Sequence, residues 1–153
     1  AGFIGSRFGR KRTMSVGLIV IILVMAIALY LGLQAANGRV SVDFVVKAFA
    51  GLFLLGGFGW GMVNVNSLPM IVDMTTEEKV GGYTGLYYFF SMAANIFAPP
   101  LSGMAIDYFG YQSLLIFATV FFVLALIAVQ FVRRGDIVGQ TSQEIYELIP
   151  DMD

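Results

Sequence analysis

The 153-residue sequence contains no cysteine and no histidine, and only 12% of its residues are charged. The lack of thiol and imidazole side chains excludes disulfide bonds, thiol catalysis, a Ser-His-Asp triad and metal sites built from Cys and His. The acidic residues lie in polar links, at the ends of apolar runs and in the last twenty residues. We therefore expect no enzyme, no catalytic residue, no cofactor and no metal. The net charge of −1 favours neither acidic nor basic partners, so we expect no nucleic acid.

Apolar residues make up 58% of the chain, and its mean hydropathy is +0.83. A soluble domain has roughly 25% charged and 45–50% apolar residues. The apolar residues form four runs, at about 14–33, 44–72, 82–106 and 114–132. A run of about 20 residues, at ~1.5 Å rise per residue, matches a ~30 Å hydrocarbon layer. The sequence thus predicts an all-α bundle of four transmembrane helices over residues 1–133, followed by a polar tail at 134–153.

The basic residues are distributed unevenly between the two sides of this topology. With four spans, both ends of the chain and the link near residue 80 share one side. An excess of Lys and Arg marks the cytoplasmic side of a membrane protein. We therefore predict cytoplasmic ends and a location in the plasma membrane. That side holds Arg7, Arg10, Lys11, Arg12, Lys79, Arg133 and Arg134, whereas the other holds Arg39 and Lys47.

The four runs differ in composition. The first and fourth consist mainly of Leu, Ile, Val, Phe and Ala, as expected of helices that face lipid. The second and third contain Gly, Pro, Asn, Ser and aromatic residues. Such residues are tolerated in a membrane where helices pack closely or line a wet cavity. We therefore expect the second and third runs to form the working part of the protein.

Helical spacing selects candidate substrate-binding residues in these two runs. At about 100° per residue, Trp60 and Asn64 share a face with Phe53, Gly57, Gly61 and Ser67. In the third run, Tyr88 and Asn95 share a face with Thr84, Ser91 and Pro99. An aromatic ring can stack on a solute while amides bond its polar groups. We therefore predict that Trp60, Asn64, Tyr88 and Asn95 bind substrate.

Helix packing explains the same spacing as well as a cavity does, and both interpretations stay open. Gly57 and Gly61 form a Gly-x-x-x-Gly pair, which typically lets two helices approach closely. Asn66 lies on the opposite face, with Met70 and Asp73, and we expect it to bond a neighbouring helix. The further residues predicted to pack are Pro99, Pro100 and Gly103.

Two shorter patterns predict turns and caps. Gly103 to Gly110 corresponds to Gly2 to Gly9 at four positions, with identical residues at three and Ser6 opposite Asp107 at the fourth, which indicates a turn used on both sides of the membrane. Thr75 and Glu78 have the spacing of a capping box that would open the third helix.

Residues 2–12, Gly-Phe-Ile-Gly-Ser-Arg-Phe-Gly-Arg-Lys-Arg, resemble the Gly-x-x-x-Asp-Arg-x-Gly-Arg-Arg/Lys-Arg/Lys loop of the major facilitator superfamily. Residues 98–103, Ala-Pro-Pro-Leu-Ser-Gly, look like the Gly/Pro motif of its helix five or eleven. The resemblance implies a twelve-helix fold, with the four runs as helices nine to twelve. It also implies a gating loop made of Gly2, Arg7, Gly9, Arg10, Lys11 and Arg12. Ser6 replaces the acidic residue of the loop, and Asp73 or Glu77 could pair with Arg7 or Arg10 instead.

The family implies a secondary transporter that moves a small solute by alternating access. Asn64-Val-Asn66-Ser-Leu-Pro69 and the Tyr-rich start of the third run resemble sugar and glycoside symporters. A drug or lipid exporter of the same superfamily is the alternative, as is a four-helix assembly subunit that transports nothing. The expected partners are a small-molecule substrate, a coupling proton or sodium ion, membrane lipid and the missing part of the same chain, because the sequence begins inside a motif.

Overall fold

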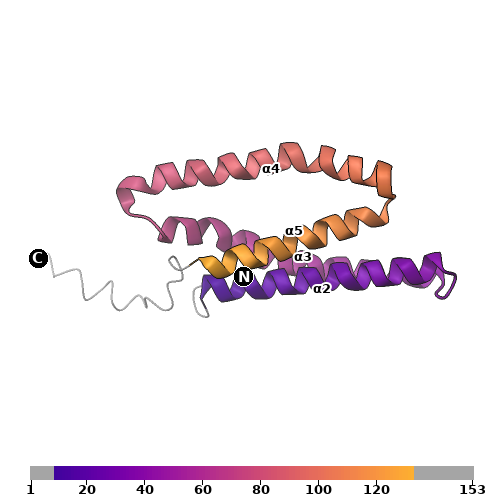
Figure 1. Ribbon diagram of the computed structural model, residues 1–153. Coiled ribbons are helices and arrows are strands. Elements are labelled where there is room, and N and C mark those ends of the chain that lie inside the picture. The colour runs from indigo at the N-terminus through magenta and orange to yellow at the C-terminus, as the bar shows by residue number, and fades with distance from the viewer. Residues whose placement is uncertain (1–8, 133–153) are drawn as a thin grey trace, which may run out of the picture.

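The computed structural model describes residues 9–132 as four long α-helices and one short 3₁₀ helix, with no strand among them (Figure 1). The predicted all-α fold is confirmed. Each long helix, with η1 counted as part of the third, is long and apolar enough to cross a membrane. Most helix ends lie a few residues beyond the apolar runs, because polar residues at a membrane surface can continue a helix. The elements are α2 (Arg10–Ala36), α3 (Val42–Asp73), η1 (Glu77–Lys79), α4 (Val80–Phe109) and α5 (Gln112–Phe131).

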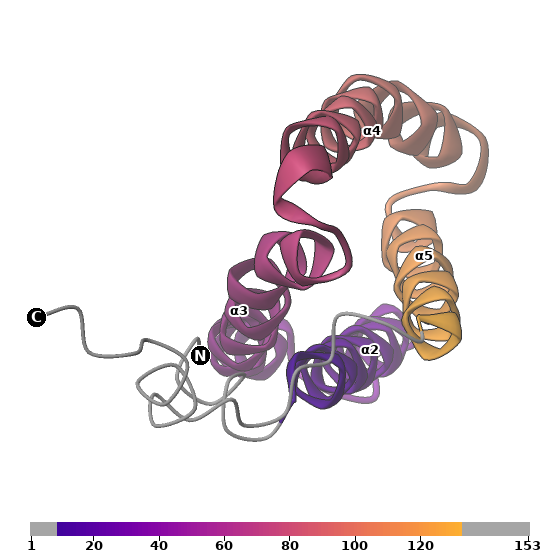
Figure 2. The same cartoon turned by 90° about the vertical axis from the view of Figure 1, so that its left-hand side faces the viewer.

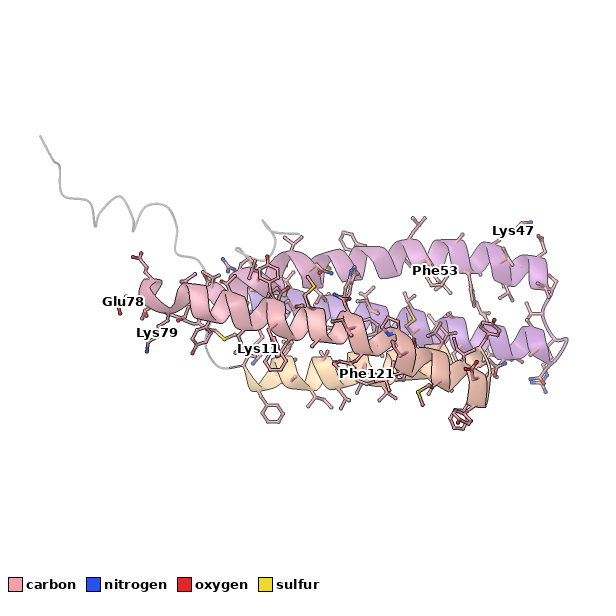
Figure 3. All side chains as sticks on the ribbon, turned by 90° about the horizontal axis from the view of Figure 1, so that it is seen from above. Lys11, Lys47, Phe53, Glu78, Lys79 and Phe121 are labelled. Atoms are coloured by element: carbon pink, nitrogen blue, oxygen red, sulfur yellow. The ribbon has the colours of Figure 1, made fainter. Side chains whose placement is uncertain are left out.

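Consecutive helices run in opposite directions, so the start of α2 and the end of α5 lie at the same end of the bundle as the α3–α4 link (Figure 1). We call this the basic end, defined by Arg10, Lys11, Arg12 and Lys79. Lys47 lies at the opposite end (Figure 3). This arrangement agrees with the predicted topology, in which both ends of the chain and the link near residue 80 share one side. The cytoplasmic location of that side stays a prediction.

The α2–α3 contact forms the core of the described bundle. Gly17 and Gly59 meet there so closely that a Cβ on Gly17 would lie 2.7 Å from the Gly59 carbonyl oxygen. Small residues allow such close approach between membrane helices. The buried apolar side chains of α2 are Met14, Leu18, Ile21, Val24 and Ala28.

The expectation that the first run faces lipid stays a prediction. α2 lies between α3 and α5 and contributes more buried residues than any other described helix (Figure 2). On another side of the same helix, Val16, Ile19, Leu23 and Ile27 are exposed and leave an apolar face open. Leu and Val suit a helix interface as well as they suit lipid.

Within the described residues, α4 and α5 contain no buried residue. α4 contacts α3 near its start, through Tyr87, and it borders α5 along its second half. Figure 1 shows that this second half, coloured orange, is bent relative to the first half. Pro99 and Pro100 lie inside this helix. Proline removes a backbone donor and commonly bends a helix. The prolines thus shape α4 without ending it.

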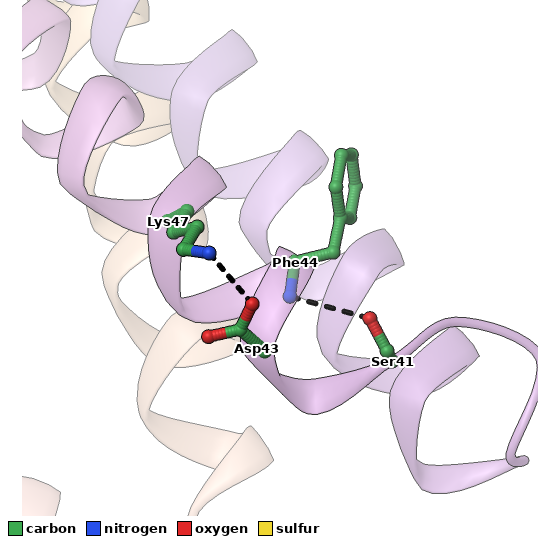
Figure 4. A network of polar contacts seen from close by, with 4 residues as sticks. All are labelled: Ser41, Asp43, Phe44 and Lys47. Atoms are coloured by element: carbon green, nitrogen blue, oxygen red, sulfur yellow. Dashed lines mark hydrogen bonds and ion pairs between the residues drawn. The ribbon is translucent and has the colours of Figure 1, made fainter.

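The links at both ends of the bundle explain where the helices begin and end. Ser41 caps α3 through its Oγ, which accepts a hydrogen bond from the Phe44 backbone N at 3.4 Å (Figure 4). Gly9, before α2, has a φ of 90°, and Gly110, after α4, has a φ of 78°. Positive φ values of this size favour glycine, so each of the two turns depends on its glycine. The predicted capping box is wrong, because neither η1 nor α4 has a side-chain cap and Thr75 precedes the N-cap residue of η1, Thr76.

Candidate functional site

One face of α3 is turned toward α4 and α5. Near the basic end, Ser67 Oγ and Tyr87 Oη lie 2.9 Å apart and form a hydrogen bond between α3 and α4. Farther along, the rings of Trp60 and Phe122 meet edge to face, with centroids 6.2 Å apart, and join α3 to α5. Trp60 and Ser67 therefore both point toward the space that α4 and α5 border. Asn64 shares this face by helical spacing.

Two hollows follow the side of α4 that faces the other helices. The one nearer the basic end has a volume of about 450 Å³ and is lined by Tyr87 and Ser91 among apolar residues. The second, about 570 Å³, lies between α4 and α5. Ala94 lines both, so the two hollows adjoin. Besides Ala94, the second is lined by Phe97, Ala98, Pro99, Leu101, Ser102, Leu114, Phe117, Ala118, Phe121 and Phe122.

The structure brings together some of the predicted substrate-binding residues and separates others. Asn64 donates from Nδ2 to the Trp60 carbonyl oxygen at 3.2 Å, so this amide and this ring are neighbours. Trp60 is 53% exposed, which leaves much of its indole accessible. Tyr88 is also half exposed, and its one aromatic contact among the described residues is with Tyr87. Asn95 is exposed. None of the four predicted residues directly lines either hollow, and Trp60 reaches the larger one only through its contact with Phe122.

Tyr87 and Phe122 are the residues at this site that the sequence reasoning missed. Tyr87 directly precedes the predicted Tyr88. It was missed because helical spacing groups residues into faces without fixing which face meets a neighbouring helix. Phe122 belongs to a run whose uniform composition singles out no residue. A search for hydroxyls on the second and third runs at equal depth could have paired Tyr87 with Ser67.

The predicted packing at Gly57, Gly61 and Gly103 does not occur between the described helices, and it stays a prediction. A Cβ added at Gly57, Gly61 or Gly103 would meet nothing within 4 Å, whereas Gly17 and Gly59 make the close contact. Gly59 was missed because it lies about 100° around the helix from Trp60 and so outside the face that the helical spacing selected. Pro99 lines the larger hollow, and Pro100 is exposed.

Asn66 is buried, with 2% of its surface exposed, on the face of α3 that meets α2. Its Nδ2 donates to the Met62 carbonyl oxygen of its own helix at 2.7 Å. The placement against a neighbouring helix matches the sequence argument, but the predicted hydrogen bond to that helix is wrong. A bond within the helix satisfies the amide donor without requiring a polar residue on α2.

The basic end ties three helices together. Arg10 of α2 forms an ion pair with Asp73 of α3, and these side chains are 24% and 18% exposed. Lys11 Nζ donates to the carbonyl oxygens of Gln130 and Val132 at the end of α5, at 2.8 Å each. One of the pairings that the sequence allowed, Arg10 with Asp73, is thus formed. Of the other predicted loop residues, Gly9 directly precedes α2 and Arg12 is exposed, whereas Gly2 and Arg7 lie outside the described residues.

A comparison with protein-family models matches residues 1–145 to the Major Facilitator Superfamily. No curated protein and no solved structure matches the chain. The match extends from the glycine- and arginine-rich loop through all four helices, so it covers every residue of the site.

Proposed function

The chain belongs to the Major Facilitator Superfamily, and from this premise we propose that its α3, α4 and α5 line part of a solute pathway that opens by alternating access. Members of this superfamily are secondary transporters, so the function is transport. Substrate sites in such transporters lie near the middle of the membrane. Trp60 and Phe122 lie well inside their helices, away from both ends of the bundle.

The observation that supports this proposal most directly is the pair of contacts made by the Trp60 face. The Ser67–Tyr87 hydrogen bond and the Trp60–Phe122 ring contact turn that face toward the hollows instead of toward α2. Asn64, on the same face, is exposed. An exposed amide inside a membrane span is costly unless it meets water, protein or a solute. A solute pathway explains why the amide occurs there.

The walls of the hollows favour a solute with an apolar or aromatic body and few hydrogen-bonding groups. The larger hollow is lined by four phenylalanines, and its one hydroxyl-bearing residue is Ser102. A free sugar carries many hydroxyls, each of which needs a partner when it leaves water. The geometry therefore favours the drug-like alternative over the sugar symporter. Trp60 would stack on the ring of the solute and Asn64 would bond one polar group.

The coupling ion, a proton or sodium, binds outside the middle of these four helices. The acidic residues of the four long helices lie in the first or last turns, at Asp43, Asp73 and Asp107. A carboxylate that exchanges protons in a transporter characteristically lies within the membrane and faces a cavity. Among residues 9–132, no acidic residue lines either hollow.

Transport assays on cells that express the whole protein test this proposal. The probes are a fluorescent aromatic cation and a radiolabelled methyl glucoside, and we expect faster movement of the aromatic probe. Trp60→Ala combined with Asn64→Ala should lower its initial rate by at least about tenfold, as the loss of specific pocket contacts does.

The matched control is Phe58→Ala with Val65→Ala, two exposed residues on the opposite side of α3. This control should transport normally when its expression equals that of the wild type. Normal transport of both probes by the Trp60/Asn64 variant would contradict the assignment of the pathway. Preferred transport of the glucoside would contradict the assignment of the solute class.

A further inference from the structure

A second hollow of different chemistry lies between α2 and α5 at the basic end. Its volume is about 560 Å³, and it is lined by Lys11, Arg12, Ser15, Val16 and Gln130. Two of these residues are basic and none is acidic. Gln130 Nε2 donates to Ser15 Oγ at 2.9 Å, which joins the two helices at this point. The Lys11 bonds to the end of α5 hold the helices together beside it.

Arg12 is the charged group that this hollow offers to a ligand. Its side chain is exposed and forms no ion pair or hydrogen bond with the rest of the described chain. Arg10, by contrast, is occupied by Asp73 on the α3 side of α2.

Apolar surface continues from the hollow along both helices. On α2, the exposed residues Val16, Ile19, Leu23 and Ile27 follow Arg12 at intervals of three and four, so they share its face. On α5, the exposed residues Ile127, Val123, Val120 and Ile116 precede Gln130 at intervals of three and four, so they share its face. Two apolar stripes thus run into the membrane from one polar, positively charged hollow.

We propose that this hollow binds the headgroup of an anionic phospholipid. The phosphate would pair with Arg12, for which guanidinium geometry is well suited. Ser15 and Gln130 would bond the remaining headgroup oxygens, and the acyl chains would lie along the two stripes. Basic pockets between membrane helices are known to take anionic headgroups. A free phosphate shares the headgroup chemistry, but it would leave the stripes unused.

Native mass spectrometry of the whole protein in detergent tests this site independently of transport. The probes are phosphatidylglycerol and phosphatidylcholine with identical acyl chains, and inorganic phosphate. We expect phosphatidylglycerol to bind more tightly than phosphatidylcholine. Arg12→Gln should weaken phosphatidylglycerol binding about fivefold, the effect of one basic residue on an anionic lipid.

Lys79→Gln is the matched control, because it removes one exposed positive charge at the same end of the bundle. It should change binding by less than about twofold, since Lys79 lines a different hollow, with Glu78 and Gly82, and not this one. Val16→Ser should weaken binding of the lipid, and inorganic phosphate should not displace the lipid at equal concentration.

Three results would overturn the proposal. The two lipids could bind equally, which would mean that the headgroup charge is not recognised. Arg12→Gln and Lys79→Gln could lose the same affinity, which would indicate general surface attraction. Inorganic phosphate could displace the lipid with the same dependence on Arg12, which would make the hollow a site for free anions.

Discussion

α2 and α3 meet through glycines, whereas α4 and α5 meet around a hollow lined by aromatic side chains. In the first pair, Gly17 and Gly59 bring the two backbones close, and the neighbouring Leu18, Ile21 and Met62 are buried. In the second pair no described residue is buried, and about 570 Å³ of space remains. Both pairs are apolar enough to span a membrane.

The difference shows that hydropathy places helices in the membrane but does not pack them. Lipid tails are as apolar as leucine, so helices associate through close contact and hydrogen bonds. Glycine at the contact allows that closeness, and bulky rings prevent it. The same contrast separates a structural pair, α2–α3, from the pair that borders the proposed solute pathway.

The largest expected effect comes from placing a side chain in the glycine contact. Gly17→Val would put its Cβ 2.7 Å from the Gly59 carbonyl oxygen, and a helix backbone cannot move aside easily. We expect a loss of about 3 kcal/mol in the free energy of unfolding, near the upper end for overpacking. The measurement is denaturant unfolding of the whole protein in detergent.

Gly32→Val is the control for this substitution, in the same helix and with nothing within 4 Å of its Cβ. Val has a slightly better helix propensity than Gly, so we expect Gly32→Val to change the stability by less than about 1 kcal/mol and not to lower it. Equal losses of unfolding free energy in the Gly17→Val and Gly32→Val variants would contradict the special role of glycine in the α2–α3 contact.

A middle effect is expected from the ion pairs at opposite ends of α3. Asp73→Ala would leave the largely buried Arg10 without its carboxylate, at a cost of about 1.5 kcal/mol. Lys47→Ala breaks a pair within α3 whose side chains are 74% and 77% exposed, at a cost of about 0.3–0.5 kcal/mol. Unfolding of both variants measures the difference.

Exchanging the charges sharpens the same prediction. Arg10→Asp combined with Asp73→Arg should recover most of the stability, and the transport, that each single variant loses. A double variant that is no better than the single ones would show that the pair does not act through attraction between these two groups.

The smallest effect on stability is expected from the hydrogen bond between α3 and α4. Tyr87→Phe removes the hydroxyl that bonds Ser67 and should cost about 0.6 kcal/mol, the average for such bonds between membrane helices. Tyr88→Phe removes a hydroxyl that makes no hydrogen bond with another described residue, and it should leave the stability unchanged. Unfolding measurements that reversed this order would mean that Tyr88, and not Tyr87, faces α3.

Several features of the fold and site could be predicted from residue types alone. Four helices followed from the length of the apolar runs, and Asp73 was one of two acids available to the loop arginines. The pairing with Arg10 became certain only in the structure, because Glu77 in the same link had a suitable charge too. Asn66 was placed on the correct face, but its partner could not be predicted, since an amide can bond its own helix as readily as a neighbour.

The sequence by itself determined that the chain crosses a membrane as four helices and belongs to a transporter family, because burial in lipid requires long apolar runs with their backbone hydrogen bonds satisfied internally. Only the tertiary structure decided that Gly17 and Gly59 bring two of the described helices into contact. It likewise selected Tyr87 over Tyr88 and left Arg12 exposed beside α5. These choices depend on the rotation of each helix about its axis, and a period of 3.6 residues defines the faces of a helix without saying which face its neighbours cover.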